Sequence, residues 1–219
     1  MASFFRLILD TLAPAGVQIL INSGAQYTTS RNVNLEISTS DSDTTGYQMK
    51  IWGIDGVASE VDASWETFSS SKTVTLPSGD GLKTIYLKVR DDVCNESSAA
   101  SASITLNTAV PVVTITGPDI GRISKTSPKN VCNFSFVCDV AFVEYKVKVV
   151  TAVSSLQDTG VQIPVSGGSA NMAGKGSFSA NTAIQCKIDG ADLEEASSGD
   201  GEKIIKVFVK NSAGTWSVA

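Results

Sequence analysis

Histidine is absent from this sequence of 219 residues. Its absence removes the commonest general base of enzymes, the imidazole ligands of metal sites, and every catalytic dyad or triad that pairs a nucleophile with histidine. Chemistry by Asp, Glu, Lys or Tyr remains open, but the pattern singles out no pair of carboxylates for it. We therefore expect a protein that is not an enzyme and that uses no cofactor.

Positive charge is also scarce, because 17 Lys and Arg face 22 Asp and Glu and the net charge is −5. That sign opposes binding to a phosphate backbone, so no nucleic-acid partner is expected. No run approaches the roughly 18 uninterrupted apolar residues that a membrane span needs, so no membrane partner is expected either. The first residues are apolar but lack a basic start, and Arg6 and Asp10 interrupt them. They read as an ordinary β-strand, which favours synthesis and folding in a cytoplasm without Sec export.

An internal repeat organises the chain. Segment 9–14 (LDTLAP) returns as 106–111 (LNTAVP), an offset of 106 − 9 = 97 residues, and 47–51 returns as 145–149. Segment 78–83 (SGDGLK) returns as 198–203 (SGDGEK), an offset of 198 − 78 = 120. The longer offset indicates an insertion near 151–176, which its glycines and serines suggest is a flexible exposed loop. The repeat predicts an N-terminal strand at 1–9 and two homologous domains at 10–108 and 109–219.

Short strands of alternating polarity, separated by turn residues, fill both copies. The first copy has strands near 17–22, 31–39, 46–53, 72–77, 82–91 and 99–107, and the second near 112–116, 131–138, 142–150, 176–188 and 203–210. Only 191–196 could form a helix, of one or two turns. The spacing predicts an all-β fold of two tandem immunoglobulin-like Greek-key β-sandwiches.

Segments 89–97 (VRDDVCNES) and 209–217 (VKNSAGTWS) resemble the turn after the penultimate strand of bacterial immunoglobulin-like domains, whose usual form is Asp-x-x-Gly-Asn-x-Ser. Cys94 stands where that family has Gly, and Asn211 and Thr215 replace Asp and Asn. Such domains occur on bacterial surfaces and, without signal peptides, in the virions of tailed bacteriophages. The resemblance therefore implies a virion protein whose partners are copies of itself and other virion proteins.

Four cysteines form no CxxC pair and have no histidine with which to complete a zinc site, so no metal is expected. Cys132 and Cys138 would lie about 20 Å apart on one extended strand, which is too far to bond. An antiparallel partner strand at 182–188 makes Cys132 with Cys186 the plausible disulfide. The alternative is that all four are buried thiols. Cys94, in a turn, is the expected exposed thiol and candidate for an interchain bond.

The two copies differ in their last strand. After its turn, the first copy continues into 101–106, whereas the second copy has only two residues left in this sequence. Shifted by 97, Phe5, Leu7 and Leu9 fall on the inward positions 102, 104 and 106. Segment 3–9 is thus predicted to act as a donor strand that completes the second domain of another copy. The alternative is that 1–9 packs on the first domain and the second domain has six strands.

These observations predict a non-enzymatic structural component of a tailed-phage virion, such as a head-decoration, neck, tail or baseplate accessory subunit. The alternative is a glycan-binding or adhesive surface module, because Trp52, Trp65 and Trp216 could stack on the sugars of a host surface glycan. Acidic clusters at 41–43 and 91–92 could contribute to a calcium site, although solvated turn carboxylates explain them equally well.

Overall fold

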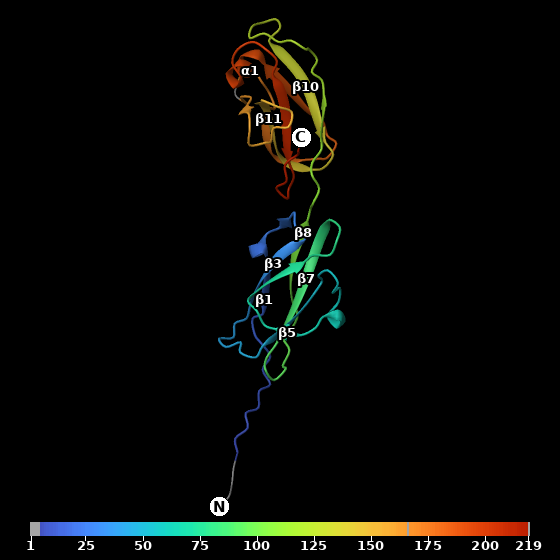
Figure 1. Cartoon of the computed structure of the whole chain (residues 1–219), viewed down its shortest axis with the longest axis vertical. Coiled ribbons are helices and arrows are strands. Elements are labelled where there is room, and N and C mark those ends of the chain that lie inside the picture. The colour runs from blue at the N-terminus through green and yellow to red at the C-terminus, as the bar shows by residue number, and fades with distance from the viewer. Residues whose placement is uncertain (1–4, 166, 219) are drawn as a thin grey trace, which may run out of the picture. The chain divides into compact units, whose positions relative to one another are not determined.

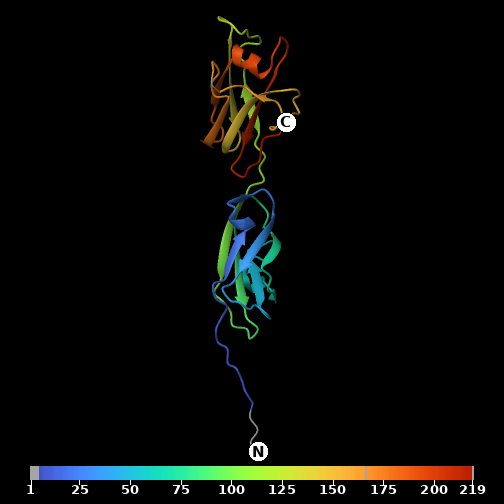
Figure 2. The same cartoon turned by 90° about the vertical axis from the view of Figure 1, so that its left-hand side faces the viewer.

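A computed structural model describes residues 5–165 and 167–218 (Figures 1 and 2). The chain divides into two compact units, Met1–Thr108 and Ala109–Ala219. Each unit has its own hydrophobic core between two antiparallel layers of strands. No helix within the described residues is long and apolar enough to cross a membrane.

Unit 1 is a sandwich of a three-stranded sheet and a five-stranded sheet. The first has the order β1 (Gln18–Ile21), β3 (Asn32–Ser38), β6 (Ser71–Thr75). The second has the order β2 (Tyr27–Thr28), β8 (Ala100–Leu106), β7 (Gly81–Arg90), β4 (Gln48–Trp52), β5 (Glu66–Thr67). Two short 3-10 turns, Asn22–Gly24 and Glu60–Asp62, lie between strands.

The alternating sequence of unit 1 explains its core. Ile85, Leu87 and Val89 on β7 have no exposed surface, and Ile104 and Leu106 on β8 are each 1% exposed. Ser101, Ser103 and Thr105 alternate with them, and the two serines are exposed. Because successive strand residues face opposite sides of a sheet, the apolar positions of β8 cover those of β7.

Unit 2 repeats this plan, with β9 (Val113–Thr116), β10 (Val131–Cys138) and β14 (Ile184–Asp189) in one sheet. The other sheet contains β11 (Phe142–Val150), β12 (Val161–Gln162), β13 (Ala173–Phe178) and β15 (Ile204–Lys210). One helix, α1 (Gly190–Ala196), follows β14, and Asp189 caps it by accepting a hydrogen bond from the backbone N–H of Ala191. Both units are thus immunoglobulin-like β-sandwiches, as the repeat and the alternation predicted.

Two predictions for unit 2 were wrong. The single strand expected at 176–188 is two strands, because β13 pairs with β11 in one sheet and β14 pairs with β10 in the other. The insertion near 151–176 is not simply an exposed loop: it supplies β12 and the start of β13, and Ile163 and Met172 are fully buried. The Gln162 amide donates to the carbonyl oxygens of Val147 and Met172, each at 2.8 Å, which fixes this segment on β11.

Candidate functional site

The turn that ends β7 returns almost unchanged after β15. Ser97 accepts a hydrogen bond from the backbone N–H of Val89 at 3.0 Å, and Ser217 accepts one from Val209 at 3.1 Å. Asp91 accepts from the N–H of Asn95 at 2.8 Å, and Asn211 accepts from Thr215 at 2.9 Å. The side chains named by the family resemblance therefore perform the same task in both units, namely satisfying the backbone groups of one tight turn.

The two units differ in what lies beside this strand. In unit 1, β7 pairs with β4 on one edge and with β8 on the other. In unit 2, β15 pairs with β11, and among the described residues no strand occupies its second edge. Residues 81–83 pair with β8 alone and are part of β7, whereas the equivalent residues 201–203 are outside β15. The second edge of β15 is thus an open strand edge with unpaired backbone groups.

A groove of about 320 Å³ lies along this open edge. Its apolar lining includes Val113 and Ile115 of β9, Ile205 and Val207 of β15, and Val218. Ile205 is only half-buried, although its equivalent in unit 1, Ile85, has no exposed surface. The difference arises because β8 covers Ile85. The groove therefore has the position and the chemistry to receive a strand with apolar side chains at alternate positions.

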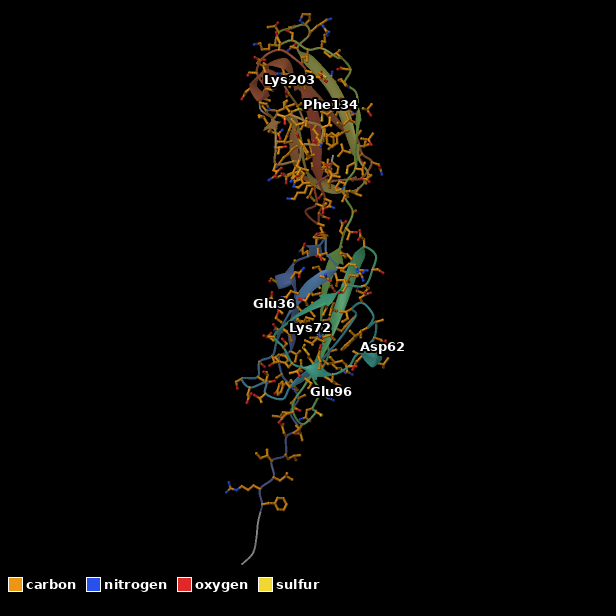
Figure 3. All side chains as sticks on the ribbon, in the orientation of Figure 1. Glu36, Asp62, Lys72, Glu96, Phe134 and Lys203 are labelled. Carbon is orange, nitrogen blue, oxygen red and sulfur yellow. The ribbon has the colours of Figure 1, made fainter. Side chains whose placement is uncertain are left out.

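The N-terminal segment 5–9 is extended, but it forms no strand and does not pack on the sheets of unit 1 (Figure 3). Phe5, Leu7, Ile8 and Leu9 are 85–90% exposed. Neither the ordinary strand favoured for this segment nor its packing on the first domain is therefore present in residues 5–9. The donor-strand residues Phe5, Leu7 and Leu9 are accessible, whereas residues 3–4 of the predicted donor strand lie outside the described residues.

The chain enters both units in the same way after these segments. Ala15 donates its backbone N–H to the Asp41 carboxylate at 3.2 Å, and Val112 donates to Asp139 at 2.8 Å. The residue pairs match at offsets of 97 and 98. Segment 5–9 thus precedes unit 1 in the same local setting in which β8 precedes unit 2.

The cysteines do not form the predicted bridge. Cys132 lies opposite Ile188, Cys186 lies opposite Phe134, and none of the four cysteines, all within the described residues, is in a disulfide. Cys132, Cys138 and Cys186 are buried. Burial disfavours the thiolate, which raises the pKa of Cys132 and Cys138 and raises that of Cys186 to about 12. Only Cys94 is exposed, in agreement with the prediction that placed it in a turn.

A maleimide reagent should accordingly label one thiol of the native chain at pH 7 and four in urea, because the thiolate is the reactive form and the buried thiols are protonated and covered. Mass spectrometry would count the labels and place the first on Cys94. Cys94→Ser serves as the control and should leave the native chain unlabelled. Rapid native labelling of two or more thiols would contradict this burial pattern.

Cys94 also has a left-handed backbone, with φ of 70°, and its equivalent Gly214 has φ of 90°. A side chain in this region costs about 1–2 kcal/mol, which exceeds the 0.5–1 kcal/mol of entropy that glycine loses on folding. Cys94→Gly should therefore stabilise unit 1 by about 0.5–1 kcal/mol, measured by urea unfolding. Cys94→Ser keeps the strained backbone and should produce no gain; an equal gain in both variants would assign the effect to the thiol instead.

The other candidate ligand-binding residues have partners within their own unit. Trp52 is buried and stacks on Tyr86 with ring centroids 5.5 Å apart, whereas Lys50 and Arg90 lie over the Trp65 ring. Lys146 lies 4.9 Å from the centroid of Trp216. Within the described residues, no three His, Cys, Asp or Glu side chains are grouped so that they could hold a metal ion. The structure thus assembles neither a sugar-stacking platform nor a calcium cage from these residues.

No protein-family model matches the sequence, and no curated protein sequence matches it. Among solved structures, the chain is similar to the fibronectin(III)-like modules of Clostridium thermocellum CbhA, with a TM-score of 0.48, 11% identity, and coverage of 91% of this chain and 89% of that one. It is also similar to the FN1-FN3 domains of chicken CNTN1, with a TM-score of 0.37, 13% identity, and coverage of 94% and 64%. A chitinase from Bacillus thuringiensis has a TM-score of 0.32 and 13% identity, with coverage of 92% and 30%. Identities this low concern the arrangement of strands and say nothing of function.

Proposed function

We propose that this protein is a non-enzymatic structural subunit of a tailed-phage virion that assembles head to tail through its immunoglobulin-like units. The observation that carries the proposal is the pairing of two features, the open edge of β15 with its apolar groove and the exposed apolar segment 5–9. Each feature alone exposes groups that proteins normally cover, and the repeat aligns one with the other.

The contact is a strand addition in which residues 5–9 of one copy pair with the open edge of β15 in another. The unit 1 register places Leu9 opposite Gly201, Leu7 opposite Lys203 and Phe5 opposite Ile205, as Leu106, Ile104 and Ala102 lie opposite Gly81, Lys83 and Ile85. Phe5, Leu7 and Leu9 then face the groove. Because the two surfaces differ, the contact is heterologous, and the copies either close into a ring or continue as a filament.

The virion assignment is supported by the resemblance of both turns to bacterial immunoglobulin-like domains and by the absence of histidine. Two experiments test the proposal. Sedimentation velocity of the purified chain should show self-association, and gold-labelled antibodies should decorate phage particles from the source of the sequence. A monomer at high concentration would overturn the assembly mode. Binding of the chain to bacterial surface glycans, without any label on particles, would favour an adhesive module instead.

A further inference from the structure

The Gly-Asp-Gly turn that precedes β7 holds the chain where it leaves unit 1. The Asp80 carboxylate accepts a hydrogen bond from the hydroxyl of Thr108 at 2.8 Å and from its backbone N–H at 3.0 Å. Thr108 lies two residues beyond Leu106, the end of β8. Asp80 therefore fastens the end of the last strand to the turn that begins the neighbouring strand.

Unit 2 contains the same turn with the same backbone. Gly79 and Gly81 have φ of 79° and 120°, and Gly199 and Gly201 have φ of 83° and 130°. Lys83 donates to the carbonyl oxygen of Ser78 at 3.1 Å, and Lys203, labelled in Figure 3, donates to that of Ser198 at 3.2 Å. Asp200 stands between the two glycines as Asp80 does. Its carboxylate is exposed and accepts no hydrogen bond from the described residues.

The residue that would complete this turn lies beside the donor strand. Leu9-Asp10-Thr11 aligns with Leu106-Asn107-Thr108, so Thr11 follows Leu9 as Thr108 follows Leu106. Thr11 is exposed, and in the part of the chain that the structure describes neither its N–H nor its hydroxyl has a hydrogen-bond partner. A free acceptor at one surface thus matches a free pair of donors at the other.

We infer that Asp200 of one copy binds the hydroxyl and the backbone N–H of Thr11 of a second copy. This contact rests on the proposed head-to-tail assembly and specifies its register. Leu9 must lie opposite Gly201 for Thr11 to reach the carboxylate, and a shift by one residue would also turn Leu7 and Leu9 away from the groove. Asp200 therefore helps the acceptor to select one alignment of the donor strand.

The test measures self-association of the full chain by sedimentation velocity. Asp200→Ala and Thr11→Val should each raise the dissociation constant roughly tenfold, because hydrogen bonds to a charged group are lost. The double variant should be no weaker than Asp200→Ala, since the two side chains act on each other. Asp158→Ala removes an exposed charge from unit 2 and is the matched control, which should leave the dissociation constant unchanged.

The outcomes separate this contact from the assembly itself. If the unaltered chain associates and both single variants associate equally well, the Asp200–Thr11 contact is overturned while head-to-tail assembly stands. An additive loss in the double variant would show that the two residues act separately and would overturn the contact as well. If the unaltered chain stays monomeric, both the contact and the proposed function fail. An unchanged melting temperature of each variant confirms that the units are intact.

Discussion

Replacing Leu7 with Thr should weaken self-association of the chain by roughly 10- to 100-fold. In the register transferred from unit 1, Leu7 takes the place of Ile104, which is 1% exposed. Burying a leucine side chain contributes about 1.5–3 kcal/mol, and each 1.4 kcal/mol changes a dissociation constant tenfold. Because Leu7 is 85% exposed in the free chain, the substitution should leave the stability of both units unaltered. Sedimentation velocity over a concentration series measures the effect.

Ile8→Thr is the matched control for this prediction. Ile8 is 90% exposed and aligns with Thr105, which alternates with the two buried positions of β8. It should therefore point away from the groove, and its loss should change the dissociation constant by less than about threefold, which corresponds to less than 1 kcal/mol. Equal losses at positions 7 and 8 would indicate a greasy, unregistered contact and would refute strand addition.

Phe136→Ala should destabilise unit 2 by about 3–5 kcal/mol, the usual range for removing a buried aromatic ring. Phe136 is 1% exposed, and its ring centroid lies 5.2 Å from that of Tyr145 and 6.3 Å from that of Phe142. The cavity would lie between the two sheets, where β10 faces β11. Differential scanning calorimetry should show the transition of unit 2 lowered by more than about 10 °C.

The transition of unit 1 should not move in this variant, because each unit has its own core. Phe5→Ala removes the same ring from a position that is 86% exposed, and it should change neither transition. A single transition that falls as a whole in Phe136→Ala would contradict the independence of the two cores.

The strands of unit 1 and the two-unit plan could be predicted from the sequence, because alternation and turn residues act locally. Ala102, Ile104 and Leu106 were correctly assigned to the inward face of β8. The division of 176–188 could not be predicted in this way. The chain crosses from one sheet to the other at Asn181, whose φ is 55°, and which sheet a strand joins depends on distant partners.

The cysteine pairing and the insertion failed for a similar reason. Whether Cys132 meets Cys186 depends on the exact register of β10 and β14, which alternation leaves open by two residues. The burial of Ile163 and Met172 was hidden by the glycines and serines around them. The open edge of β15 was found only by comparing the two copies, whereas the groove beside it and the bare Asp200 carboxylate needed coordinates.

The pairing of β2 with β8 has a mechanical consequence. The two strands run parallel, with Tyr27 opposite Thr105 and Thr28 opposite Leu106. Their hydrogen bonds run from the N–H of Thr105 to Gln26 at 3.0 Å and from the N–H of Asn107 to Thr28 at 2.9 Å. Tension that pulls segment 5–9 and the chain beyond Thr108 apart draws parallel strands along each other, so both bonds are strained together in shear instead of opening one after the other. Unit 1 is thereby suited to carry tension along the chain.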